Sequence, residues 1–288
     1  MAGVRIVCDS TADLEADFRE AHDVRVIPLK VIFGDEVFED GVTIHPSDFY
    51  ARMRSSSVHP RTSQPTPAEF EAAFRELSED GSSIVCTTIS SEMSGSLASA
   101  TQARAALPDR DIRVIDTLSV AVGHNAAVHA AIVAAEAGAS AEAVVAAVRM
   151  VLDTQKILFT VETLEYLRRG GRIGGARALV GSVLDIKPIL EIRGGVIEPV
   201  DRARTFGRAL DRIVGTITEA AKNWSGANVI VGHADKADVA AGLAERMRPL
   251  TGGGEVRIID VGPVVGAHAG PGAIGIGFRP LAPGGLTN

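Results

Sequence analysis

The chain of 288 residues is poor in aromatic side chains, which make up 4% of it, and it contains only two cysteines, Cys8 and Cys86. Because 46% of its residues are hydrophobic, aliphatic side chains and alanine must form the core. Each cysteine ends an apolar run, which favours buried thiols of a reducing compartment over a disulfide. The sequence also lacks any Cys or Cys/His spacing typical of zinc sites. We therefore expect neither a disulfide framework nor a metal centre.

Positive charge is scarce as well, since the formal net charge is −7. This balance argues against binding to nucleic acid or to an anionic membrane surface. The chain has no uninterrupted apolar run of about 18 residues, so we expect no membrane span. The first residues enter a strand pattern at Val4 without the features of a signal peptide, and we therefore expect a cytoplasmic protein.

Apolar runs alternate with amphipathic stretches over the first half of the chain, which is typical of β/α units around a parallel sheet. Buried strands are predicted at 4–8, 24–29, 83–88 and 112–116, with a hairpin over 30–42. Helices are predicted at 46–53, 67–77 and 96–106, with two more within 119–151. The segment Thr66-Pro-Ala-Glu69 has the capping-box pattern of a helix start, and Ser140 is a predicted N-cap. Ser10 and Asp13 resemble a second capping box.

The second half of the chain is less regular, and a boundary is predicted near 152–156. Strands are expected at 157–161, 187–193, 196–200, 228–232 and 255–261. Helices are expected at 163–169, 176–184, 205–223 and 237–248. Gly194-Gly195 is typical of a two-residue hairpin turn. The pattern predicts an α/β protein of two domains, residues 1–153 and 154–288.

Three loops rich in hydroxyl side chains follow predicted strands of the first half, at 9–11, 61–66 and 87–96. Ligands of open α/β sheets bind beyond the carboxyl ends of strands, where helix N-termini attract anions. Hydroxyls add donors without a fixed charge, so this set suits a carboxylate or a phosphate. Helix capping is the alternative use of such residues. Thr62 and Ser94 are not needed as caps and are the stronger candidates.

A glycine-rich run over 262–277 has His268 as its one titratable residue. Because glycine lets backbone approach a ligand closely, the run predicts the wall of a binding site. A bulged glycine-rich strand is the alternative. The dinucleotide fingerprint within 270–275 is a false match, because no βαβ unit fits between it and residue 288.

Other catalytic templates are absent, including the Gly-x-Ser-x-Gly elbow and the phosphate loop. Arg168, Arg169 and Arg172 form a basic cluster at a predicted helix end. They either complement the helix dipole or meet a phosphate or an acidic partner. For Arg202 and Arg204 the same two roles are possible, a local structural role or contact with a phosphate or an acidic partner.

Six segments together resemble the DegV family of bacterial fatty-acid-binding proteins, and the match runs along nearly the whole chain. Ser96 departs from the threonine common in the family, which is a conservative change. The segments are Asp9-Ser-Thr-Ala-Asp-Leu14, Thr62-Ser-Gln-Pro-Thr66, Ser90-Ser-Glu-Met-Ser-Gly95, Leu164-Glu-Tyr-Leu-Arg-Arg-Gly-Gly-Arg-Ile173, Lys187-Pro-Ile-Leu190 and Gly262-Pro-Val-Val-Gly-Ala-His-Ala-Gly-Pro-Gly272.

The resemblance implies a parallel-sheet three-layer α/β/α domain and a mixed-sheet two-layer domain, with an apolar tunnel between them. A long-chain fatty acid would lie in the tunnel as the bound ligand, with no other cofactor and no metal. The implied ligands of its carboxylate are Thr62, Ser94 and His268. Loop support is implied for Ser63, Gly95, Gly266 and Gly270, and contact with a phosphate or a kinase for Arg204, Arg172 and Arg169.

The family further implies a carrier rather than an autonomous enzyme. A separate ATP-dependent fatty acid kinase would phosphorylate the bound acid, and the carrier would deliver the acyl phosphate to phospholipid synthesis. Two alternatives stay open. The fold is similar to that of dihydroxyacetone kinase substrate domains, in which a histidine bonds covalently to a small ketone, and His268 is the candidate for that role. A protein-interaction surface built on Arg168, Arg169 and Arg172 is compatible with either function.

Overall fold

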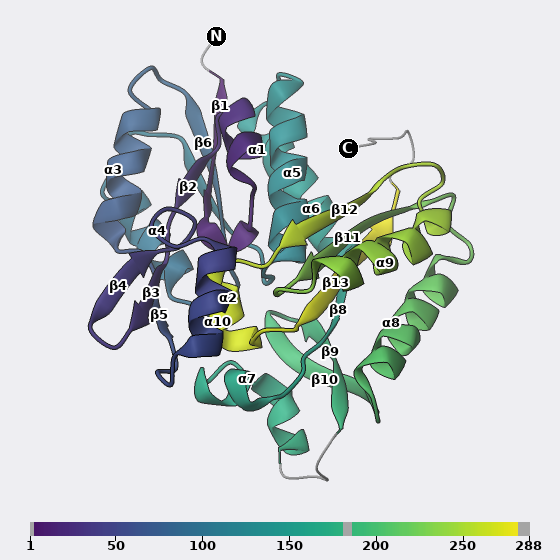
Figure 1. Ribbon diagram of the computed structural model, residues 1–288. Helices are drawn as coiled ribbons and strands as arrows, with labels where there is room; N and C mark the ends of the chain where they lie inside the picture. Colours follow the sequence, from purple (N-terminus) through teal and green to yellow (C-terminus); the bar gives the residue numbers. More distant parts are fainter. Residues whose placement is uncertain (1–2, 181–185, 282–288) are drawn as a thin grey trace.

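The computed structural model describes residues 3–180 and 186–281 and contains three sheets (Figure 1). The first half builds a four-stranded parallel sheet in the order β2-β1-β6-β7. Its strands are Val4–Asp9 (β1), Arg25–Ile27 (β2), Ser83–Thr88 (β6) and Ile112–Asp116 (β7). The second half builds a mixed six-stranded sheet in the order β10-β9-β8-β13-β11-β12. The predicted α/β class, with one parallel and one mixed sheet, is confirmed.

Helices cover both faces of the parallel sheet, which gives three layers. On one face, Phe70 and Phe74 of α3 (Pro67–Leu77) and Ala100 of α4 (Ser96–Ala105) pack on the strands. On the other face lie α5 (Val122–Glu136) and α6 (Ala141–Thr154), with the short α1 (Ala16–Ala21) beside them. Cys8 and Cys86 are free and buried, as expected.

The mixed sheet is antiparallel except where β11 pairs with β12. One face is covered by α8 (Phe206–Ala221) and α9 (Ala237–Met247). The other face contacts α5, where Val122 and Ala126 pack on Ile157 and Ile230. Helix α5 therefore touches both large sheets. The strands are Lys156–Thr160 (β8), Lys187–Arg193 (β9), Val196–Ala203 (β10), Ala227–His233 (β11), Val256–Asp260 (β12) and Ile274–Pro280 (β13).

A small antiparallel sheet, β4-β3-β5, joins the two halves. It consists of Lys30–Phe33 (β3), Glu36–Glu39 (β4) and Arg61–Ser63 (β5), with α2 (Pro46–Ser55) beside it. The expected hairpin over 30–42 is present. Phe33 of β3 and Phe49 of α2 share a buried cluster with Leu167 of α7 (Glu165–Arg169) and Val264 of α10 (Pro263–Ala269). The hairpin thus packs against second-half residues.

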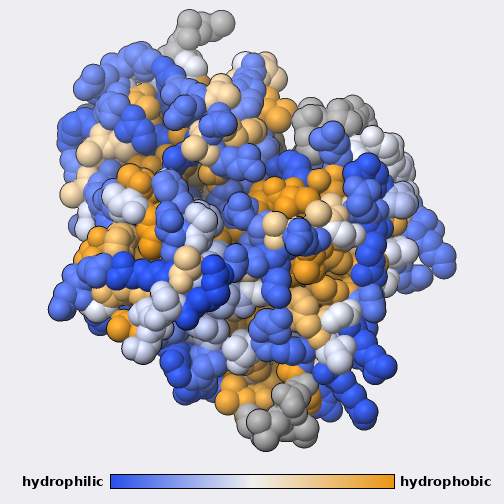
Figure 2. All heavy atoms as spheres, viewed as in Figure 1, coloured by the Kyte–Doolittle hydropathy of each residue, from blue (hydrophilic) through white to orange (hydrophobic). Residues whose placement is uncertain are grey.

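Several local predictions are confirmed. Thr66 forms the capping box with Glu69, and the Ser140 side chain accepts the backbone N–H of Ala143. Gly194 and Gly195 both have positive φ in the turn between β9 and β10. Hydrophilic side chains cover most of the face drawn in Figure 2, with hydrophobic residues in smaller separate areas. None of the helices in the described part of the chain is both long and apolar enough to span a membrane.

Other local predictions are wrong. Ser10 and Asp13 form no capping box, because Ser10–Ala12 is a 3-10 turn whose cap is Asp9 and the Ser10 hydroxyl donates to Asp40 instead. The predicted loop at 61–66 begins with strand β5, since main-chain pairing with β3 outweighs its polar composition. The glycine-rich run contains helix α10 before β13.

The helix expected at 176–184 is observed in part. A 3-10 helix spans Gly174–Leu179, and residues 181–185 lie outside the described residues. The division of the chain into domains at 153 and 154 stays a prediction.

Candidate ligand-binding cavity

One cavity opens between the three sheets and holds the candidate residues from both halves of the chain. It encloses about 970 Å³ of space free of protein atoms, part of it continuous with solvent. The lining comes from β5, the β6–α4 and β7–α5 loops, β8–β11, α7, α10 and β13. The cavity therefore exists only where the two halves meet.

Thr62 and His268 form a hydrogen-bonded pair at this cavity. Thr62 on β5 and His268 on α10 are 206 positions apart, and Oγ1 lies 2.8 Å from Nε2. A Cβ at position 170 would lie 2.0 Å from His268 Nδ1, so Gly170 gives the imidazole its room. If Nε2 carries the ring proton, it donates to Thr62 and leaves the threonine hydroxyl hydrogen free for a ligand.

The imidazole of His268 is uncharged at neutral pH. Burial lowers its pKa to about 4, and the positive charge of Arg172 and the neighbouring His59 act in the same direction. Its Nδ1 atom is buried and has no hydrogen-bond partner in the described part of the chain. The pair thus offers a ligand neutral hydrogen-bonding groups instead of a cation.

Ser94 reaches the same cavity from the β6–α4 loop. Its Oγ lies 3.0 Å from Ser96 Oγ and accepts the backbone N–H of Ser96 at 3.3 Å. The hydroxyl therefore sits at the start of α4, beside free amides of the first helical turn. The structure brings Thr62, Ser94 and His268 to one cavity, with Thr62 on strand β5, and their role as ligands of a carboxylate stays a prediction.

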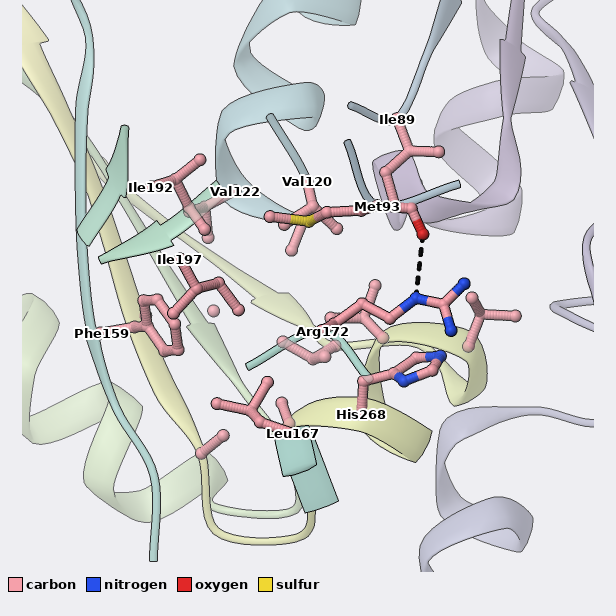
Figure 3. Close-up of a pocket in the computed structure, with 18 of the residues that line it drawn as sticks. Ile89, Met93, Val120, Val122, Phe159, Leu167, Arg172, Ile192, Ile197 and His268 are labelled. Carbon is pink, nitrogen blue, oxygen red and sulfur yellow. Dashed lines mark hydrogen bonds between the residues drawn. The ribbon is translucent and has the colours of Figure 1, made fainter. Parts of the chain in front are cut away.

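Arg172 lies beside His268 and joins two loops at this end of the cavity (Figure 3). Its Nε–H donates to the Met93 carbonyl at 3.0 Å, and Nη1 donates to the Gly170 carbonyl at 2.7 Å. The guanidinium thereby fixes the Ser94 loop against the turn after α7. It also adds the one positive charge on the cavity lining among the described residues.

The opposite end of the cavity is apolar. Phe159, Ile192 and Ile197 lie across the space from His268 in Figure 3. Val120 and Val122 at the start of α5 complete this side. Gly232 and Gly275 also line it, and they bring strand backbone to the surface of the cavity. Such a surface can bury a hydrocarbon and cannot hydrogen-bond a polar ligand through side chains.

The remaining candidate residues have different positions. Ser63 points its hydroxyl to the Gln64 carbonyl, and Gly95 approaches the Gln64 amide. Gly266 and Gly270 face aromatic rings, since a Cβ there would lie 2.5 Å from Tyr50 Oη and 2.2 Å from Tyr166. None of these four lines the cavity itself.

Two of the predicted arginines also lie off the cavity. Arg169 is exposed and pairs with Glu165 at 2.6 Å. Arg204 is exposed on the segment between β10 and α8 and is absent from the cavity lining. The structure thus gathers Arg172 with the three polar candidates, whereas Arg204 belongs to another part of the surface.

Sequence reasoning missed Gln64 and the apolar lining. Gln64 lines the cavity next to Thr62, and its place in the hydroxyl-rich segment was the signal that could have identified it. The apolar residues carried no such signal, because aliphatic side chains in strands look the same whether they face a core or a cavity. Within residues 3–180 and 186–281, no group of three or more His, Cys, Asp or Glu side chains is placed to hold a metal ion.

Comparison with known proteins gives matches along nearly the whole chain. The family model described as "Uncharacterised protein, DegV family" matches residues 3–281. A DegV domain-containing protein of Streptomyces coelicolor is 38% identical over 276 residues, which cover 95% of this chain and 97% of that protein. The structure of a DegV family protein from Thermus thermophilus, described as fatty acid binding, has a TM-score of 0.90 at 33% identity, covering 97% of this chain and 100% of that one. A stearic acid-binding protein from Eubacterium ventriosum gives a TM-score of 0.88 at 29% identity, covering 97% and 98%.

Proposed function

Because this chain belongs to the DegV family, we propose that it binds a long-chain fatty acid in the cavity, with the carboxylate held by Thr62, Ser94 and His268. The observation that best supports this proposal is the Thr62–His268 hydrogen bond at one end of a cavity whose opposite end is apolar. Similar structures from T. thermophilus and E. ventriosum that are described as fatty acid and stearic acid binding support the ligand class.

Burial of the hydrocarbon supplies the affinity. About 14 methylenes at ~0.8 kcal/mol each give roughly 11 kcal/mol before the cost of association. The polar end then needs only to orient the acid. Neutral hydroxyls beside the uncharged His268 hold a carboxylate oxygen without the bidentate ion pair that an arginine would form.

The second part of the proposal is that the protein presents this carboxylate to an ATP-dependent fatty acid kinase of the cytoplasm. One carboxylate oxygen attacks the γ-phosphorus of ATP, the bond to the bridging oxygen breaks, and ADP leaves. The protein is then a carrier of the acyl phosphate toward phospholipid synthesis and not an enzyme by itself. Binding of the carboxylate through neutral hydrogen bonds supports this step, because it leaves one carboxylate oxygen free to react. Arg172 is the cation nearest to the site, and exposed Arg169 and Arg204 are candidates for kinase or phosphate contact.

The alternative of a small-ketone site at His268 requires a small polar pocket. The observed cavity is lined largely by aliphatic side chains, which favours a fatty acid over a triose. No observation favours the covalent role of His268.

Lipid extraction tests the first part. We expect chloroform extracts of the purified recombinant protein to contain about one long-chain fatty acid per chain, and the lipid-free protein to take up oleate or palmitate. Protein that is lipid-free as purified and takes up neither acid would contradict the proposal.

Acyl phosphate formation with the partner kinase tests the second part. We expect Thr62→Ala, Ser94→Ala and His268→Ala to slow this reaction more than they weaken binding of the acyl chain. Ser63→Ala is the matched control, because its hydroxyl contacts only the Gln64 carbonyl. Wild-type rates in all three variants would remove these residues from the site.

A further inference from the structure

Helix α10, which carries His268, begins between two carboxylates from the first half of the chain. Asp13 Oδ1 accepts the backbone N–H of Gly262 at 3.1 Å. The Asp40 carboxyl accepts a hydrogen bond from the backbone N–H of Val264, which only partly offsets the rise in its pKa caused by burial. A Cβ at Gly262 would lie 2.6 Å from Asp13 Oδ1 and 3.3 Å from Asp40 Oδ1. Both acids therefore meet at the helix start.

This helix start determines where His268 stands. Helix α10 has seven residues and packs against α2, α7, β3 and β5. Strand β5 carries Thr62, and α7 leads to Gly170 beside the imidazole. Tyr50 donates to the Val261 carbonyl at 2.9 Å, which fixes the residue before Gly262. A shift of the first turn would move His268 relative to Thr62, because a helix this short transmits the displacement to its end.

Ionising both carboxyl groups at the same time costs free energy. Burial is the largest cause that raises the pKa of each; it raises that of Asp40 to about 7, and the Asp40 charge raises that of Asp13 well above its usual value. Oδ2 of Asp13 is buried without a partner in the described part of the chain, whereas Ser10 donates to Asp40 at 2.7 Å. The other titratable groups around them, from β1, α1, α2 and β12, are Asp9, Glu15, Arg19, His45, Tyr50 and Asp260.

We propose that Asp13 and Asp40 are positioning residues that hold α10 by its first turn and thereby set the His268–Thr62 pair. Because both carboxyl groups lie at Gly262, ionisation of both at high pH places two like charges there and loosens the first turn. Binding of the acid should therefore weaken as the pH rises above about 7. The pH dependence of binding rests on the proposed function, whereas the position of His268 does not.

The imidazole of His268 gives a test that needs no ligand. Its pKa can be followed by NMR of imidazole-labelled protein, with His268→Gln to assign the resonance. We expect Asp40→Ala to hydrate the site and raise the His268 pKa from about 4 by one unit or more. Asp40→Asn, whose amide oxygen can accept the Val264 N–H and whose NH2 group can donate to the Ser10 hydroxyl, should leave it near 4. Glu15→Ala is the matched control, since it removes an exposed carboxylate from the hollow that Asp13 and Asp40 line, apart from the ligand-binding cavity. An unchanged His268 pKa in Asp40→Ala would overturn the proposal.

A pH profile tests the repulsion between the two carboxylates on a variant that keeps the shape of the site. Between pH 6.5 and 9 we expect the affinity of the wild type for palmitate to fall five- to tenfold relative to that of Asp40→Asn. Equal profiles would show that this repulsion does not control binding. Wild-type protein that binds no fatty acid at pH 6.5 would instead contradict the proposed function, and the His268 measurement would still test the positioning role.

Discussion

The two ends of the cavity are built from different chemistry and from different kinds of structure. The polar end combines Thr62, Ser94, Arg172 and His268, which come from a three-residue strand, two loops and a short helix. The apolar end is formed by longer strands of the mixed sheet and by the start of α5. The difference separates two tasks, because burial of hydrocarbon scales with area while orientation needs a few placed donors.

The two ends also differ in charge. Arg172 and His268 are the titratable side chains on the described lining, and both lie at the polar end. A substitution at the apolar end should therefore change affinity according to chain length and not according to pH. A substitution at the polar end should discriminate between acids and neutral lipids of equal length.

The largest effect is expected from filling the apolar end. Residues 274, 276 and 278 of β13 face α8 and α9, so Gly275 faces the cavity by strand alternation. A Cβ at Gly275 would find its nearest neighbour at 3.5 Å, which leaves room for a larger side chain. Gly275→Leu should displace about four methylenes and weaken stearate binding by ~3 kcal/mol, or roughly 100-fold.

Decanoate should be affected much less, because a shorter chain need not reach Gly275. Isothermal titration with both acids measures the difference. Gly207→Leu on α8 is the control, since Gly207 is exposed and a Cβ there would meet nothing within 4 Å. Equal losses of affinity for both acids would show that the apolar end does not discriminate between chain lengths.

A smaller effect is expected from the charge state of the polar end. The folded-state pKa of His268 is about 4, below the 6.5 of a free imidazole. The unfolded chain therefore binds a proton first as the pH falls, and the folded state loses stability between pH 6.5 and 4. Since His268 is only partly buried, the loss should be about 2 kcal/mol, less than the full shift implies.

Urea unfolding at pH 7, 5.5 and 4.5 measures this loss. In His268→Gln, the free energy of unfolding should fall less over this pH range than in the wild type. Some loss of stability with falling pH should persist in the variant, because burial also lowers the pKa of His129 to about 3 and lowers the pKa values of His124 and His59. Parallel profiles would mean that the imidazole of His268 already titrates normally in the folded protein.

The smallest effect is expected from removing one hydroxyl. Thr62→Val keeps the shape of the side chain and removes the partner of His268 Nε2. It should weaken stearate binding by ~1 kcal/mol, or about fivefold, and leave methyl stearate unchanged. Competition against a fluorescent fatty acid can compare the two ligands. An equal loss for acid and ester would place Thr62 on the chain-binding surface instead of the head-group site.

Local sequence signals predicted much of the fold because their physics is local. The Thr66–Glu69 capping box, the Ser140 cap and the Gly194-Gly195 turn each involve residues within four positions of one another. The same logic failed at Ser10, whose hydroxyl prefers Asp40, 30 positions away. It also failed at the glycine-rich run, where α10 is stabilised by packing on α2 and by Asp13 and Asp40 more than by helix propensity.

The sequence alone determined most strands and helices of both halves, with the exception of β5 and α10, together with the buried thiols and the candidate set of Thr62, Ser94 and His268. Periodicity, capping and family motifs are written in consecutive residues. Only the tertiary structure decided that Thr62 and His268 touch across 206 positions, that Arg172 joins them while Arg204 does not, and that aliphatic strands enclose a cavity. The physical reason is that such contacts depend on how sheets and helices pack, and the local sequence around each residue does not identify its distant partner.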